Sequence, residues 1–266
     1  MKHAVIHTFA GSAADLSALN LDYYVVTPPT GQQWRTLGLK EGPFDPKLFH
    51  IERHERVLPS AVINREAEVR FAAYEDQTGR KPGKKQRAII KESVIEDLLP
   101  KAFIRVSHIA VTIARGLLIV WTSSIPKADE VVSLLVGLLR SEGIDATIEF
   151  KPINVPLNVV ALGKHDNLMP GSSVVLAGPE KQKVRIKDLS VESHRVQPLI
   201  EVDQYSVTEI EVVLSSGDAC TITNKGIVKN IQLHDVAERG DDDEAVSWMH
   251  TDFVKRLVDA TDEDEL

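Results

Sequence analysis

The spacing of apolar positions predicts two strands and two helices over the first hundred residues. Lys2–Phe9 and Leu48–Val57 have the composition and alternation that are typical of strands. Apolar residues then recur at helical intervals over residues 60–78, and again over residues 84–99. The chain therefore begins with a mixture of strands and helices.

A turn rich in glycine and proline separates the two predicted helices. Two helices joined by so short a turn are expected to form an antiparallel hairpin, with its tip at Gly79–Lys85. Ser60 is the expected N-cap of the first helix. The positions expected to face the partner helix are Val62, Val69 and Ala73 in the first helix and Ile90, Val94 and Leu98 in the second.

The next fifty residues return to strands. Ser107–Ala114 and Gly116–Thr122 are β-branched runs joined by a turn at Arg115-Gly116, which predicts a β-hairpin. A helix that opens at Pro126 is expected to follow, and Ala146–Phe150 is expected to be a strand.

Beyond Lys151 the apolar runs become short, and prolines separate them. The runs that predict strands are Val174–Ala177, Val184–Ile186, Val207–Leu214 and Cys220–Thr223. A last helix is expected over Val246–Val258. This part of the chain is therefore expected to be mostly β.

The predicted fold class is α+β, with an antiparallel sheet domain that carries an inserted helical-hairpin finger, and a β-rich second domain. The expected boundaries are 1–57 and 101–150 for the sheet domain, 58–100 for the finger, 151–239 for the β-rich domain and 240–266 for an acidic C-terminal segment.

The distribution of charge changes what the composition alone would suggest. The formal net charge is −8, which argues against a nucleic-acid partner. However, the last 27 residues carry ten acidic and two basic residues, so the rest of the chain is neutral overall. A single cysteine excludes an internal disulfide and a cysteine-clustered zinc site. With no apolar run of about 18 residues and no signal-like N-terminus, we expect a cytoplasmic protein without a membrane partner.

Two basic clusters stand out against this neutral background. Arg80–Lys91, at the predicted hairpin tip, contains six basic and no acidic residues: Arg80, Lys81, Lys84, Lys85, Arg87 and Lys91. Such a cluster can bind the phosphates of a nucleic acid without reading its sequence, or it can be a solvated turn. In the second cluster, Lys181, Lys183, Arg185 and Lys187 alternate with uncharged residues. On a strand this puts four cations on one face, which suits a row of phosphates but also suits an edge strand protected against aggregation.

Motifs for catalysis and for cofactors are weak. Gly79–Lys84 is one residue too short for a phosphate-binding loop, and it follows a helix rather than a strand. His50 and His54 lie on a predicted strand, which would hold them about 13 Å apart, too far for one zinc ion. The acidic run Asp241–Glu244 is expected to be solvated. We therefore expect no catalytic residue, no metal and no cofactor.

Several segments resemble the RdgC family of recombination-associated proteins. They are Arg56–Ile63 (RVLPSAVI), Arg80-Lys81, Leu98–Phe103 (LLPKAF), Gly116–Val120 (GLLIV), the helix from Lys127 to Arg140 and, more weakly, Lys183–Leu189. The resemblance implies a homodimer that closes as a ring around double-stranded DNA and restrains a RecA-type recombinase indirectly, without catalysis, in association with the nucleoid. It implies DNA contacts by the two basic clusters and a role for Phe103 in a dimer interface, although Phe103 could also be an ordinary core residue. The residues implied to contact DNA are Arg80, Lys81, Lys84, Lys85, Arg87, Lys183, Arg185 and Lys187.

Two other classes of function remain open from the sequence. One is a metal-dependent nuclease that uses scattered carboxylates. The other is a protein–protein adaptor in which both basic clusters only face solvent.

Overall fold

The computed structural model describes residues 2–9, 24–40, 48–114, 116–141, 150–234 and 243–262, and the chain forms two compact units. Unit 1 comprises Met1–Leu19, Phe44–Phe49 and Ala110–Leu266, and unit 2 comprises Asn20–Pro43 and His50–Ile109. The fold is α+β with a large antiparallel sheet, as the sequence predicts.

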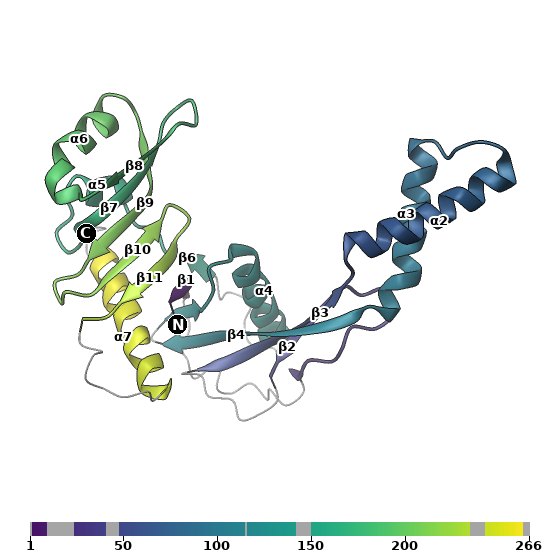
Figure 1. The fold of residues 1–266 in the computed structure, drawn as a ribbon. Helices are drawn as coiled ribbons and strands as arrows, with labels where there is room; N and C mark the ends of the chain where they lie inside the picture. Colours follow the sequence, from purple (N-terminus) through teal and green to yellow (C-terminus); the bar gives the residue numbers. More distant parts are fainter. Residues whose placement is uncertain are drawn as a thin grey trace. The chain divides into compact units, whose positions relative to one another are not determined.

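Unit 2 contains a small sheet and a helical hairpin (Figure 1). Its strands are β2 (Arg35–Leu39), β3 (Phe49–Val57) and β4 (Phe103–Ala114), in the order β2-β3-β4, and β4 continues into unit 1. Its helices are α2 (Ser60–Thr78), α3 (Lys84–Leu98) and the short 3-10 helix η2 (Leu99–Lys101). Both predicted helices are therefore present with nearly the predicted bounds.

The core of the hairpin corrects one prediction for the first helix. Ala67 and Phe71 of α2 pack against Val94 of α3, and Ile63, Ile90 and Leu98 are half-buried around them. Ile90, Val94 and Leu98 are thus confirmed, but Val62 and Val69 are 46% and 62% exposed, and Ala73 is exposed too. Helix α2 therefore has two apolar stripes, one with Val62, Val69 and Ala73 and one with Ile63, Ala67 and Phe71. The stripe with the large Phe71 side chain is the one that packs against α3. The N-cap prediction is also wrong, because Pro59 occupies that position and Ser60 is the first helical residue.

A buried arginine ties the base of the hairpin to the sheet of unit 2. The guanidinium of Arg56, on β3, donates hydrogen bonds to the carbonyl oxygens of Leu99 at 2.8 Å, Pro29 at 2.6 Å and Gln33 at 3.2 Å. A buried charge is tolerated when its donors are satisfied in this way. Arg56 begins the segment RVLPSAVI that carries the family resemblance, so the structure gives this part of the motif a structural role.

Unit 1 is built on one antiparallel sheet. The strand order is β4-β5-β1-β11-β10-β9-β7-β8, and β6 also pairs with β1. The strands are β1 (His3–Phe9), β5 (Leu117–Val120), β6 (Phe150–Pro152), β7 (Met169–Ala177), β8 (Lys183–Lys187), β9 (Ser206–Val213), β10 (Ala219–Thr223) and β11 (Ile227–Gln232). The helices are α4 (Ile125–Ser141), α5 (Leu157–Ala161), α6 (Leu189–Glu201) and α7 (Asp243–Asp262).

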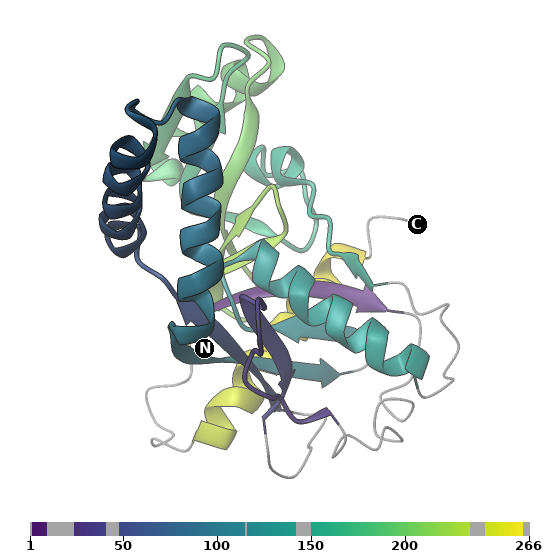
Figure 2. The same ribbon diagram turned by 90° about the vertical axis from the view of Figure 1, so that its right-hand side faces the viewer.

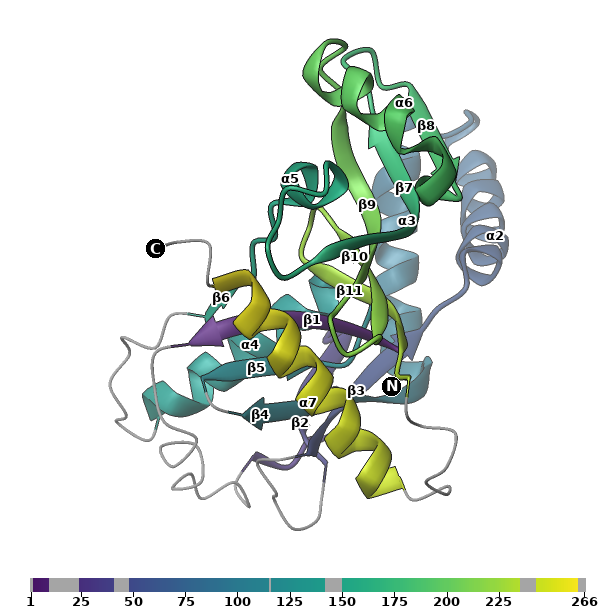
Figure 3. The same cartoon turned by 90° about the vertical axis from the view of Figure 1, so that its left-hand side faces the viewer.

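The two faces of this sheet are covered differently. Helices α5, α6 and α7 lie on one face (Figure 3), where Val160, Val196 and Phe253 belong to the same core as Ile6 and Ile222. Helix α4 lies on the opposite face, across β1 (Figure 2). Since β5 is buried along its whole length, the β4–β5–β1 end of the sheet is covered on both sides. On the α4 face, no described helix of unit 1 covers the β8 end.

Most of the elements predicted for unit 1 are present. The predicted strands correspond to β1, β5, β7, β8, β9 and β10, and the predicted last helix corresponds to α7. Of the predicted strand Ala146–Phe150, all but Phe150 lies outside the described residues, and Phe150 begins β6. The sequence patterns did not reveal α5, α6 and β11, so the second half is less purely β than expected. Pro198 lies inside α6, and a proline is unfavourable within a helix, which explains why the sequence pattern did not reveal this helix.

Helix α7 is fastened to the sheet by a buried carboxylate. Asp218, in the turn before β10, accepts hydrogen bonds from Ser216 Oγ at 2.7 Å, from the backbone N–H of His234 at 2.9 Å and from Arg256 of α7 at 2.6 Å. Burial by itself would raise the pKa of Asp218, but these hydrogen bonds from Ser216, His234 and Arg256 outweigh it and the pKa is lowered.

Replacing Asp218 with asparagine is expected to lower the free energy of unfolding by about 2 kcal/mol, because Arg256 loses a charged partner that is buried. Since the folded pKa of Asp218 lies below its unfolded value, this contribution is complete above about pH 4 and is lost as the pH falls through the folded pKa. Urea unfolding at several pH values would measure it. Asp252→Asn is the matched control, because it removes the other, half-exposed partner of Arg256 and should cost only a few tenths of a kcal/mol. Equal losses in the two variants would contradict the role given to Asp218.

Candidate nucleic-acid interface

The basic tip of the hairpin is a turn with a glycine at each end. Helix α2 ends at Thr78 and is capped by Gly79, whose φ of 69° is left-handed and whose N–H donates to the carbonyl oxygen of Glu75 at 2.8 Å. Helix α3 begins after Gly83. The turn between them therefore has a defined course and presents the basic residues at its surface.

Four cations of this tip are available to an external ligand. Arg80, Lys81, Lys84 and Lys85 are exposed, and none of them has an ion-pair partner within the described part of the chain. We call these four residues the tip cations. Because no described carboxylate neutralises them, they form a compact patch with a formal charge of +4.

Arg87 differs from the tip cations although it belongs to the same sequence cluster. Its Nε donates a hydrogen bond to the carbonyl oxygen of Pro82 at 3.0 Å, and its guanidinium lies 5.4 Å from the centre of the Phe71 ring. These contacts hold the turn against α2. Arg87 therefore has a structural role, which the spacing of charges along the sequence did not reveal.

The second basic cluster lies on β8, the edge strand of the sheet in unit 1. Lys183, Arg185 and Lys187 are exposed on one face of this strand, while Ile186 is buried on the other. The predicted row of four cations is wrong by one residue, because Lys181 has a φ of 64° and lies in the turn before the strand. The position of β8 at the edge also fits the protective role of lysines, so both interpretations of the cluster stand.

A hollow of about 450 Å³ adjoins β8 on the sheet face that lacks a described helix of unit 1. Its lining contains two of the strand cations, Lys183 and Arg185, and two further lysines, Lys225 and Lys229, from the β10–β11 hairpin. Sequence reasoning missed these two lysines. The sequence Asn224-Lys225-Gly226 between two β-branched runs is a hairpin signal that could have revealed them.

The predicted interface residue, Phe103, is on the surface of unit 2. Its side chain is 88% exposed at the start of β4, where Ile104 and Val106 are also exposed. An ordinary core position is therefore excluded within this chain. On one side β4 neighbours β3, and on its other side β5 pairs only with Val111–Ala114, so no described strand pairs with that edge from Phe103 to Ile109.

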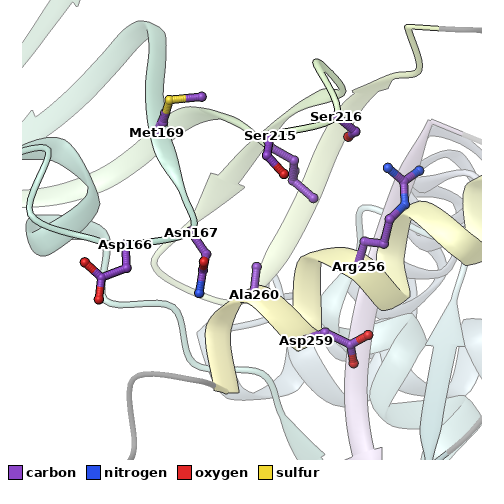
Figure 4. A pocket seen from close by; sticks show the side chains of 9 residues that line it. Asp166, Asn167, Met169, Ser215, Ser216, Arg256, Asp259 and Ala260 are labelled. Atoms are coloured by element: carbon purple, nitrogen blue, oxygen red, sulfur yellow. The ribbon is translucent and has the colours of Figure 1, made fainter.

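A second hollow, of about 340 Å³, lies beside α7 in unit 1 (Figure 4). Its lining includes Asp166, Ser215, Ser216, Arg256 and Asp259. The guanidinium of Arg256 is occupied by Asp218 and Asp252, and the hydroxyl of Ser216 donates to Asp218. No described residue of this lining is a histidine or a cysteine.

The histidines of β3 do not form a metal site in the part of the chain that is described. His54 and His108 both hydrogen-bond the carboxylate of Glu52, at 2.5 Å and 3.0 Å, and these bonds lower the pKa of Glu52. Among the described residues there is no group of three or more histidine, cysteine, aspartate or glutamate side chains that could hold a metal ion. Asp241 and Asp242 of the acidic run lie outside the described residues. None of the described helices is long and apolar enough to cross a membrane.

Comparison with known proteins points to one family. A family model described as "Putative exonuclease, RdgC" matches residues 44–258. The relative from Janthinobacterium sp. (strain Marseille), named "Recombination-associated protein RdgC", is 43% identical over 91 residues, which are 34% of this chain and 30% of that protein. Proteins with the same name from Cupriavidus pinatubonensis and Colwellia psychrerythraea are 30% identical over 152 residues and 24% identical over 216 residues. These matches cover 52% and 77% of this chain, and 51% and 70% of the relatives.

Proposed function

Because the chain belongs to the RdgC family of recombination-associated proteins, we propose that it binds double-stranded DNA without sequence preference and without cutting it. The observation that carries the proposal is the pair of exposed cation groups, the tip cations on unit 2 and Lys183, Arg185 and Lys187 on unit 1. These side chains present charge to solvent and are not neutralised by the described acids around them. Both groups are suited to phosphates, which position a protein on DNA but carry no sequence information.

We further propose that the protein acts as a homodimer, with Phe103 in one of the contacts between subunits. The exposure of Phe103 supports a dimer contact, because an exposed aromatic side chain is suited to pack against a second copy of the chain. The neighbouring edge of β4 has no partner among the described strands, so it can pair with the same edge of that second copy. In a closed ring, two such chains would encircle the duplex. Occupation of the duplex would then restrain a RecA-type recombinase indirectly, at the nucleoid.

Titration of wild-type protein onto fluorescent random duplexes at about 50 and about 200 mM salt tests the binding function. If the seven exposed cations of the two groups each neutralise a phosphate, the slope of log K against log salt should approach about −6, with similar affinity for all sequences. No binding at the lower salt concentration would refute the proposal and favour a protein–protein adaptor.

The word "exonuclease" in the description of the family model makes cleavage the second function to test. Supercoiled and linear plasmid incubated with the protein and Mg²⁺ or Mn²⁺ should shift in mobility but stay intact. Metal-dependent loss of either substrate would show that the protein is a nuclease.

A further inference from the structure

The hollow beside β8 lies on a continuous face of the sheet in unit 1. Directly paired residues of neighbouring strands share a face. Arg185 pairs with Val175, Val175 with Glu209, and Glu209 with Thr223, so these four side chains form a row across β8, β7, β9 and β10. On the next strand, Lys229 pairs with Thr221, which lies on the same face of β10 as Thr223.

On this face of the sheet, the acidic side chain of Glu209 lies between basic side chains. Lys183 and Arg185 lie on β8, and Lys225 and Lys229 lie on the β10–β11 hairpin. With about 4.8 Å between neighbouring strands, Arg185 and Lys229 are roughly 19 Å apart across the sheet. Glu209 lies between them on β9, and Lys229 Nζ donates to its carboxylate at 3.3 Å.

The Lys229–Glu209 pair is partly shielded from solvent. The side chains of Lys229 and Glu209 are 29% and 30% exposed, so salt screens their attraction less than it screens a pair in open water. While the pair is intact, Lys229 contributes almost no net positive charge to the hollow. A ligand phosphate that enters must also approach the Glu209 carboxylate.

We infer that Glu209 limits the affinity of this sheet face for phosphates, and that Lys229 is a phosphate contact which Glu209 holds in a neutralised pair. The inference rests on the proposed DNA-binding function and adds to it the residue that regulates the strength of the contact. The carboxylate repels the anion and competes with it for Lys229. The Thr223 hydroxyl and the Asn224 amide, which line the same hollow, can donate hydrogen bonds to phosphate oxygens, whereas the Thr208 hydroxyl already donates to the carbonyl oxygen of Val175.

A double-mutant cycle in the full chain tests the inference, with binding to a random duplex as the readout. Glu209→Gln should tighten binding about 5-fold at low salt, and it should steepen the salt slope by about 0.9 because Lys229 becomes free to neutralise one more phosphate. Lys229→Gln should weaken binding about 5-fold, because it leaves Glu209 unpaired in the hollow. The double variant should return close to wild-type affinity. A gain in affinity cannot arise from partial unfolding, so the first variant separates this role from a structural one.

Glu201→Gln is the matched control. It removes the same charge from a similar ion pair, Lys164–Glu201 at 3.0 Å, at the end of α6, on the helix-covered face of the same unit. If Glu209→Gln does not bind more tightly than Glu201→Gln while wild-type protein binds duplex, the inference is wrong and the proposed function stands. If wild-type protein binds no duplex at all, both are wrong.

Discussion

Replacing Arg80 and Lys81 together with glutamine should weaken binding to random duplex by about 30-fold at about 50 mM salt and by similar factors on every sequence. Both side chains are exposed and unpaired within the described residues, so each is free to neutralise one phosphate. Without these two cations the salt slope should fall by about 1.8, since each neutralised phosphate contributes about 0.9. Because phosphate contacts position the protein and do not read bases, the effect should not depend on sequence.

The control for this variant must change the net charge equally without touching the tip. Arg65 of α2 and Lys101 of η2 are exposed cations of the same unit, and their double replacement with glutamine meets this condition. It should alter the affinity by no more than about 2-fold, through long-range electrostatics alone. If the control weakens binding as much as the tip variant does, the binding depends on total charge, and the assignment of the tip cations to the duplex is wrong.

The basic tip shows how far the sequence could lead and where it stopped. The glycines and proline between two helical patterns predicted the turn, and its six basic residues predicted the cluster. The sequence could not separate Arg87 from its neighbours, because the separation depends on Phe71, sixteen positions away, whose ring lies beneath the guanidinium. Phe71 also lies on the stripe of α2 that packs against Val94 of α3, so both features of the hairpin depend on contacts between residues that are far apart in the sequence.

On the sheet of unit 1, the sequence predicted the pairing of β4 with β5 but not the neighbours of β8. The alternation in Lys183–Lys187 was enough to place three cations on one face. Lys225 and Lys229 line one hollow together with two of these cations because the strand order is β8-β7-β9-β10-β11. This order is a property of the tertiary fold. Local patterns fix which side of a strand a residue occupies, whereas the composition of a surface also requires the strand order.

Replacing Phe103 with serine should dissociate the proposed homodimer while leaving the fold of the chain intact. An aromatic anchor at the centre of an interface contributes at least about 2 kcal/mol, which corresponds to a dimer dissociation constant about 30-fold higher. Because the side chain is 88% exposed in the single chain, its removal creates no cavity, so the melting temperature of the isolated chain should not fall. Light scattering over a range of concentrations would measure the shift from dimer to monomer.

Val69→Ser is the control for this change, because Val69 is also an exposed apolar residue of unit 2 and lies on α2, outside β4. It should leave the dimer intact. If duplex binding requires both subunits, Phe103→Ser should also weaken binding, and the defect should diminish when the protein concentration is raised above the new dissociation constant. That recovery would tie the DNA defect to assembly, because a higher concentration would not restore a phosphate contact that the substitution itself had removed. Two results would contradict the role proposed for Phe103. One is a wild-type protein that is monomeric at every concentration, and the other is a dimer that is equally stable with serine at position 103.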